Sequence, residues 1–254
     1  MSGSLALVGL GPGSREHLTL RAAEVLQASD AVVGYAAYVD LVDAWFPCSA
    51  RRRVRGELGR ELERAAKAVR LARHGLDVAL VSSGDATVYG MGGPLFEVLA
   101  GEGWDGRDPP VEVVPGVTAA LAANAVVGVP LADDAAFISL SDVLAPWPLI
   151  AERVEAAARA DFVLALYNPA SSRRRRGLPR IQQILLRHRP PSTPVALVRN
   201  ALRPGTGVRL TTLEHLADAD PTVDMQTLVL VGNHQTVRCG DRLVSRRARR
   251  TEAM

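Results

Sequence analysis

The sequence contains only two cysteines, Cys48 and Cys239, and no two histidines four residues apart. The cysteines form no CxxC or Cys/His spacing, so we expect buried or incidental thiols and neither a disulfide framework nor a metal site. No apolar run approaches the ~20 residues of a transmembrane helix, and the N-terminus lacks the basic n-region of a signal peptide. These absences predict a cytoplasmic protein with no membrane partner.

Lysine and aromatic residues are also scarce. Lys67 is the only lysine among 30 basic residues, and the net charge is +3. Arginine runs at 51–53, 173–176 and in the tail 246–254 first suggest nucleic acid. Aromatic residues make up only 4% of the chain, and none alternate with the arginines as a base-stacking surface requires. Because arginine forks also bind carboxylates, we favour a carboxylate-rich small molecule over nucleic acid, and we expect the tail to be disordered.

Short apolar runs alternate with helical patterns along the 254 residues. LALVGL at 5–10, DVALVSS at 77–83 and DFVLALYN at 161–168 are predicted strands, and their alternation with helices is typical of an α/β protein with a largely parallel sheet. Tight turns such as RPGTG at 203–207 predict more antiparallel pairing in the second half. We divide the chain into α/β domains at 1–115 and 116–245, followed by the basic tail.

Two predicted strands end in glycine clusters. GLGPGS at 9–14 departs from the dinucleotide-binding GxGxxG pattern, because Ser14 replaces the last glycine and the next strand ends in Gly34 and Tyr35 instead of an acidic residue. This disfavours a nicotinamide oxidoreductase. SSGDATVYGMGGP at 82–94 places Asp85 among glycines, where a small polar ligand can approach the backbone. An alternative is that Asp85 caps the following helix.

Polar residues follow the other predicted strands as well. In VVPGVTAALAAN at 113–124, Thr118 opens a helix whose free N–H groups attract a carboxylate, or it simply caps that helix. LYNP at 166–169, VRNA at 198–201 and LVLVGN at 228–233 are polar endings on apolar strands. Ligands of open α/β sheets bind beyond the carboxyl ends of the strands, so the recurrence predicts a binding site there.

The order of these motifs resembles the class III, or tetrapyrrole, S-adenosylmethionine-dependent methyltransferases, over about residues 5–233. GYAAYVD at 34–40, SSGDATVYGM at 82–91, VVPGVTAA, ISLSD at 138–142, ALYNP, VRNA and VGN are most similar to the members that methylate C17 of precorrin-3B with ring contraction, giving precorrin-4 in cobalamin biosynthesis. Two places depart from the pattern: Ala86 stands where proline is usual, and DDA at 133–135 stands where His-Asp-Phe is expected. The alternative is a tetrapyrrole methyltransferase acting at C11, at C20 or on uroporphyrinogen III.

The resemblance implies two α/β domains with a cofactor cleft between them, a polycarboxylate tetrapyrrole substrate and a homodimer. It also implies S-adenosylmethionine as cofactor, leaving S-adenosylhomocysteine as product. The cofactor residues expected are Gly11, Pro12, Gly13, Ser83, Gly84, Asp85, Val88, Tyr89, Thr118, Ala119, Tyr167, Asn168, Asn200, Ala201 and Thr227. The substrate contacts expected are Tyr35, Arg173 and Arg199.

Ring contraction also requires a group that moves protons. The candidates are Asp142, Tyr38 and Ser139. We favour Asp142, although an aspartate at this position is equally suited to cap the helix that follows.

Overall fold

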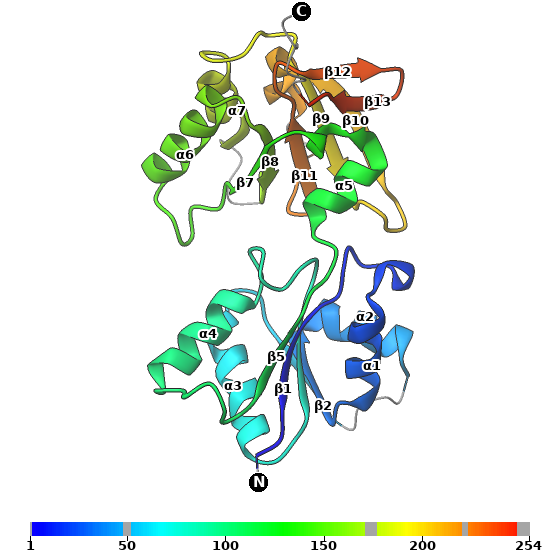
Figure 1. Ribbon diagram of the computed structural model, residues 1–254, viewed down its shortest axis with the longest axis vertical. Helices are drawn as coiled ribbons and strands as arrows, with labels where there is room; N and C mark the ends of the chain where they lie inside the picture. Colours follow the sequence, from blue (N-terminus) through cyan, green and yellow to red (C-terminus); the bar gives the residue numbers. More distant parts are fainter. Residues whose placement is uncertain (1, 48–51, 171–176, 220–222, 248–254) are drawn as a thin grey trace, which may run out of the picture. The chain divides into compact units, whose positions relative to one another are not determined.

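The computed structural model describes residues 2–47, 52–170, 177–219 and 223–247 (Figure 1). The chain divides into two compact units, Met1–Ala119 and Ala120–Met254. Each unit is built around its own five-stranded sheet. The division between the units follows Ala119, four residues after the boundary predicted from the sequence at residue 115. Most of the basic tail lies outside the described residues.

Unit 1 is a parallel α/β sheet with the strand order β3-β2-β4-β1-β5. Its strands are β1 (Leu5–Gly9), β2 (Ala31–Tyr35), β3 (Arg52–Gly56), β4 (Val78–Ser82) and β5 (Val111–Val114). Its helices are η1 (Arg15–His17), α1 (Leu20–Ala28), α2 (Ala36–Trp45), α3 (Glu61–Arg73) and α4 (Gly92–Gly101). The central strands β1 and β4 are buried along their whole length, as expected for parallel strands covered on both faces.

Alternating side chains of β1 divide the core of unit 1 into two layers. Leu5 and Leu7 pack with α3 and α4 on one face of the sheet, while Ala6 and Val8 pack with α1 and α2 on the other. Figure 1 shows these two helix pairs on opposite sides of the strands. Because successive side chains of a strand point to opposite faces, a single apolar run supplies both layers.

Unit 2 is a mixed sheet with the order β10-β9-β11-β8-β7. Its strands are β7 (Ala135–Ser139), β8 (Val163–Tyr167), β9 (Pro194–Arg199), β10 (Gly207–Thr212) and β11 (Thr227–Val231). Strand β7 runs parallel to β8, whereas β11 is antiparallel to β8 and β9, and β10 is antiparallel to β9. The predicted α/β class and the antiparallel pairing of the second half are therefore confirmed.

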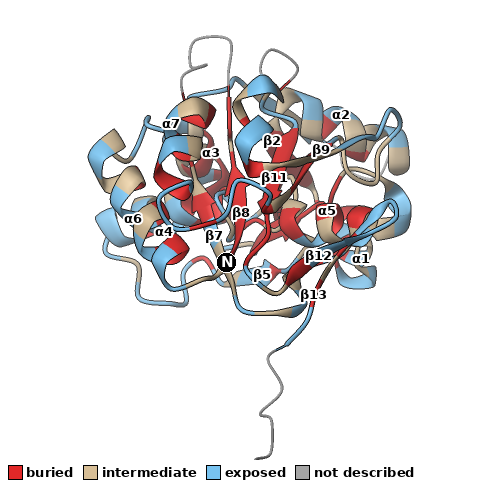
Figure 2. Cartoon of the chain, turned by 90° about the horizontal axis from the view of Figure 1, so that it is seen from above, coloured by how far each residue is buried: buried red, intermediate tan, exposed pale blue. Residues whose placement is uncertain are grey.

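The remaining elements surround this sheet. They are α5 (Ala119–Val127), α6 (Trp147–Arg159), α7 (Gly177–Leu185), η2 (Pro130–Ala132), η3 (Leu213–His215) and η4 (Ala217–Ala219), with a small sheet of β6 (Gly128–Val129), β12 (Thr236–Cys239) and β13 (Arg242–Ser245). Helices α6 and α7 bury Ile150, Val154 and Ile181 against the strands. Figure 2 shows the buried residues concentrated in the strands and the outer helix faces exposed. No helix among the described residues is long and apolar enough to cross a membrane.

Arg189 joins the chain after α7 to the sheet of unit 2. Its guanidinium is buried and donates hydrogen bonds to the carbonyl oxygens of Gly232, at 2.6 Å, and Phe162. Burial lowers the pKa of Arg189 to about 10, while the nearby carboxylate of Asp161 opposes that shift. The side chain therefore remains charged at neutral pH and serves two backbone acceptors.

We expect Arg189→Met to lower the free energy of unfolding of unit 2 by ~2–4 kcal/mol, because both carbonyls lose a charged donor. Arg187→Met is the matched control. Arg187 is exposed, and among the described residues its one ion pair is with Glu155, so its loss should cost less than ~1 kcal/mol. Urea unfolding followed by circular dichroism measures both values, and equal values would contradict the role of Arg189.

Candidate functional site

Three glycines bring the carboxyl ends of β1, β4 and β5 together in unit 1. We call Gly9, Gly84 and Gly116 the glycine triad. A Cβ atom on Gly9 would lie 2.8 Å from both the Gly116 nitrogen and the Gly84 oxygen, and one on Gly116 would overlap the Gly84 carbonyl. The three loops therefore approach one another backbone to backbone, which only residues without a side chain permit.

The loop after β1 is joined to the loop after β4 by a pair of backbone hydrogen bonds. The Gly11 N–H donates to the Gly84 oxygen at 3.0 Å, and the Gly84 N–H donates to the Gly11 oxygen at 2.7 Å. Both residues have positive φ, +66° and +64°. The sequence motifs GLGPGS and SSGD thus form one continuous structure, with Pro12 buried and Gly13 partly exposed beside it.

Asp85 links the same loops through its carboxylate. One oxygen accepts from the Thr87 N–H at 2.8 Å and from the Thr87 hydroxyl at 2.5 Å, and the other accepts from the Gly116 N–H at 3.1 Å. Partial burial would raise the pKa of Asp85, but these hydrogen bonds outweigh it and hold the pKa below its ordinary value. Asp85 is therefore a charged acceptor at neutral pH. It does not cap α4, which begins seven residues later at Gly92 with Met91 as its N-cap.

The other residues expected around this edge lie on neighbouring loops. The Ser83 hydroxyl donates to the Tyr38 hydroxyl at 2.9 Å, and Tyr38 meets Tyr35 edge to face at 5.3 Å between ring centroids. Tyr89 is exposed and adopts φ +53°. Val88 and Ala119 are partly exposed and Thr118 is buried. The described structure thus brings the cofactor residues expected in unit 1 to the carboxyl edge of one sheet.

In unit 2 the corresponding edge is formed by the ends of β7, β8 and β9. The Asn168 side chain donates to the Ser139 hydroxyl oxygen at 3.0 Å, joining the ends of β7 and β8. The Tyr167 hydroxyl accepts from the Ala120 N–H in the first turn of α5 at 3.1 Å. Ser139, Tyr167 and Asn168 therefore lie together at the ends of β7 and β8, and we refer to them as one group.

Arg199 lies at the end of β9, with Asn200 and Ala201 after it. Its guanidinium donates to Asp224 at 2.8 Å and to Gln226 at 3.0 Å. Partial burial would raise the pKa of Asp224, but the hydrogen bond from Arg199 and others keep it below the ordinary range. Thr227 also donates to Asp224, at 3.0 Å. Sequence reasoning missed Asp224, because it precedes a strand and belongs to no strand-end motif.

Residues with a strained backbone conformation lie at the same edges. Among the described residues, five other than glycine have positive φ: Tyr89, Asp161, Asn168, Asn200 and Leu202. All but Asp161 follow the carboxyl end of a strand. Such conformations concentrate at functional sites, and single-sequence patterns do not reveal them.

Two of the sequence predictions have a different outcome, and a third, Arg173, is not tested. LVLVGN does not contribute to this edge, because β11 is antiparallel and Asn233 lies at the opposite end, where it is buried and donates to Asp133 at 2.9 Å. Asp142 does not cap α6, whose N-cap is Pro146; it is exposed. Arg173 lies outside the described residues. Within the described part of the chain, no cluster of His, Cys, Asp and Glu has the composition of a metal site.

Replacing Tyr167 by phenylalanine tests the contact with α5. The Ala120 N–H is buried, so losing its acceptor should lower the free energy of unfolding by ~1–3 kcal/mol. Tyr35→Phe is the control, since no hydrogen bond joins its hydroxyl to a described residue. Thermal unfolding compares the variants, and an unchanged midpoint for Tyr167→Phe would contradict a stabilising contact between Tyr167 and α5.

Comparisons with known proteins identify the family of this chain. The family model of the tetrapyrrole (corrin/porphyrin) methylases matches residues 4–217. The chain is 43% identical to a cobalt-factor III methyltransferase of Priestia megaterium over 97% of its own length, and spans 45% of that relative's length. It is also 43% identical to the probable cobalt-factor III C(17)-methyltransferase of Salmonella typhimurium, covering 91% of this chain and 93% of the relative. Identity to the precorrin-3B C(17)-methyltransferase of a Sinorhizobium species is 37%, over 93% and 91% of the two chains.

Solved structures give the same result. The methyltransferase CobJ superimposes with a TM-score of 0.89 and 35% identity, covering 96% of this chain and 100% of CobJ. A uroporphyrin-III C-methyltransferase of Thermus thermophilus, complexed with S-adenosylhomocysteine, has a TM-score of 0.67 and 29% identity, over 91% and 97% of the chains. With a family model covering most of the chain and a relative 43% identical over nearly its full length, the sequence-based resemblance is confirmed. The chain belongs to the tetrapyrrole (corrin/porphyrin) methylase family.

Proposed function

We propose that this protein transfers a methyl group from S-adenosylmethionine to C17 of a tetrapyrrole in cobalamin biosynthesis, with contraction of the ring. The observation that carries the proposal is the 43% identity to a relative named for C17 methylation of cobalt-factor III, over more than nine tenths of both chains. A relative named for C17 methylation of precorrin-3B is also similar over its length. Both names specify C17 as the methylated carbon, and this position is the part of the activity that we assign.

The carboxyl edge of unit 1 fits S-adenosylmethionine. The glycine triad holds the three loops together at this edge, and the charged carboxylate of Asp85 can accept a hydrogen bond from a hydroxyl or an ammonium group. The N–H groups around Thr118 and Ala119, at the start of α5, suit the carboxylate of the cofactor. The other expected contacts, from Tyr167 to Thr227, lie at the corresponding edge of unit 2. When bound, the cofactor supplies a methyl group on a positively charged sulfur.

The protein's own contribution is to hold the cofactor and the substrate and to orient them relative to each other. Displacement at a methyl group needs the two reactants in line, and such positioning is worth ~7–11 kcal/mol. For the proton transfer that accompanies ring contraction, Asp142 remains our first candidate, because its carboxylate is exposed beside the end of β7. Ser139 and Tyr38 are alternatives whose hydroxyls are held by Asn168 and Ser83.

Arg199 is our candidate for binding a peripheral carboxylate of the substrate. Asp224 and Gln226 fix its Nε and one Nη, which leaves N–H groups of the other Nη for a carboxylate. We further propose a cytoplasmic homodimer that binds neither nucleic acid nor membranes, on the support of the family resemblance alone. Sedimentation equilibrium tests the dimer.

The activity is tested with S-adenosylmethionine carrying a ¹³C-labelled methyl group. The enzyme is incubated separately with cobalt-factor III, precorrin-3B and uroporphyrinogen III, and the labelled carbon is located by NMR. We expect the label at C17 with at least one of the first two substrates and none with uroporphyrinogen III. Labelling at another ring position, or of uroporphyrinogen III alone, would refute the C17 assignment while retaining the family.

A further inference from the structure

The most exposed large apolar side chains are not scattered over the surface. Among the described residues, those at least half exposed are Leu144, Leu20, Val143, Leu58, Tyr89, Leu121 and Met225. Leu20, Leu58 and Tyr89 follow the carboxyl ends of β1, β3 and β4, and Val143 and Leu144 follow β7. Leu121 lies beside the Ala120 contact to Tyr167, and Met225 lies just before β11, opposite the end of β9. These most exposed apolar side chains therefore lie near the carboxyl edge in both units.

The highest exposure within one segment belongs to Val143 and Leu144, at 82% and 96%. Residues 140–146 connect β7 to α6, and both ends of this loop are fixed. At the β7 end, Leu140 is fully buried and donates its N–H to the Tyr167 oxygen at 2.9 Å. The Ser141 N–H donates to the Ser139 hydroxyl oxygen at 3.3 Å.

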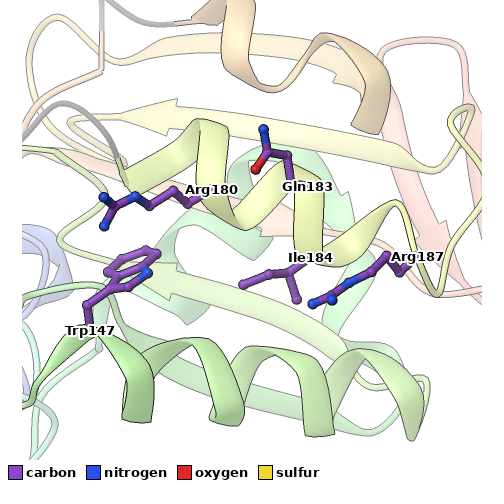
Figure 3. A pocket seen from close by; sticks show the side chains of 5 residues that line it. All are labelled: Trp147, Arg180, Gln183, Ile184 and Arg187. Carbon is purple, nitrogen blue, oxygen red and sulfur yellow. The ribbon is translucent and has the colours of Figure 1, made fainter.

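At the other end the loop runs into Trp147, the first residue of α6. The Arg180 guanidinium lies over the Trp147 ring, 5.2 Å from its centroid. Figure 3 shows the two side chains together at one end of a hollow between α6 and α7, with Ile184 and Arg187 further along it. The apolar pair thus projects from a loop held at both ends.

We infer that Val143 and Leu144 contact the apolar face of the tetrapyrrole macrocycle and help to select this substrate. The inference rests on the proposed function. A tetrapyrrole has a flat apolar centre and carboxylates at its rim. The loop bearing the apolar pair begins at the group formed by Ser139 and Asn168, and Arg199 lies on the same sheet edge for a rim carboxylate.

The chemistry of the loop favours this occupant over the cofactor. The valine and leucine side chains offer no hydrogen bond to the polar groups of S-adenosylmethionine, whereas both are stabilised by burial against an apolar surface. A second copy of the chain could cover the same side chains, and the test separates that outcome.

The test is the double variant Val143→Ser/Leu144→Ser with Leu186→Ser, an exposed apolar residue just after α7, as control. Uroporphyrin III, a stable polycarboxylate tetrapyrrole, is the probe, and its Soret band reports binding. We expect the double variant to raise the dissociation constant of uroporphyrin by about 10- to 100-fold. The affinity for S-adenosylhomocysteine, the sedimentation mass and the melting temperature should not change, and the control should match the wild type.

Unchanged uroporphyrin affinity in the double variant would overturn the inference while leaving the proposed function intact. A fall in mass would also overturn it and would place these side chains between two copies of the chain. If the wild type itself bound no uroporphyrin, the inference would be overturned, and the labelling experiment with cobalt-factor III and precorrin-3B would decide separately whether the proposed function holds.

Discussion

Gly116→Ala is expected to destabilise unit 1 and to abolish tight binding of S-adenosylhomocysteine. The added Cβ would overlap the Gly84 carbonyl and lie 2.8 Å from the Gly9 carbonyl carbon. All of these are backbone atoms, so no flexible side chain can move aside. We expect a loss of ~3 kcal/mol of unfolding free energy from this overpacking, or roughly 6–12 °C in melting temperature. Calorimetry measures the melting temperature, and titration at 15 °C measures the remaining affinity.

Gly101→Ala is the matched control for this variant. Gly101 is the last residue of α4 and has no positive φ, and no described atom beyond its chain neighbours and its own helix backbone lies within 4 Å of the position of its Cβ. The same substitution should therefore stabilise the helix by ~0.4–1 kcal/mol and leave cofactor affinity unchanged. If Gly116→Ala behaved like Gly101→Ala, the inferred close approach of the three loops would be wrong.

Asp85→Asn is expected to weaken binding of S-adenosylhomocysteine by about 10- to 100-fold. A charge-assisted hydrogen bond to the ligand contributes ~1.5–3 kcal/mol, and the amide keeps the size of the side chain while removing its charge. Asp105→Asn is the control, because Asp105 also accepts two backbone hydrogen bonds, from Arg107 at 2.9 Å and Asp108 at 3.1 Å, but precedes β5 at the other end of the strands. Equal affinity in the two variants, measured by equilibrium dialysis, would exclude Asp85 from the site.

The pH dependence of Asp85 follows from its lowered pKa. Hydrogen bonds hold the folded-state pKa below the ordinary value, which is about 3.9 in an unfolded chain. The carboxylate therefore stabilises the folded protein fully above that ordinary value, and the contribution disappears as the pH falls through the lowered pKa. The difference in stability between the wild type and Asp85→Asn should be constant from about pH 6 to 8 and shrink below about pH 4. A difference that grew on acidification would contradict the lowered pKa.

The strand-end motifs could be predicted because they depend on local sequence. An apolar run followed by glycine and polar residues specifies both a buried strand and a turn, so GLGPGS and SSGD indicated where two of these strands end. The pairing of these two motifs through Gly11 and Gly84 could not be predicted from the sequence. The two glycines are 73 residues apart in the chain and come together only because β1 and β4 are adjacent in the sheet. The three-way contact with Gly116 depends on the same strand order.

The direction of a strand was the main feature that the sequence left undetermined. The motif LVLVGN has the same pattern as the other apolar strands with polar endings. It belongs to β11, however, which runs antiparallel to its neighbours β8 and β9. Asn233 therefore lies at the opposite edge from Asn168, while Thr227, at the start of the strand, lies beside Arg199. Asp224 and Gln226 reach Arg199 for the same reason, since they precede β11 in the chain.

The carboxyl-edge loops of unit 1 are expected to hold the cofactor. Hydrogen–deuterium exchange with and without S-adenosylhomocysteine tests this expectation most directly. We predict slower exchange in peptides covering residues 9–14, 82–92 and 114–119, and unchanged exchange in α3 and in β12 and β13. Absence of protection in the three loops at saturating ligand, or protection confined to other described segments, would contradict the claim.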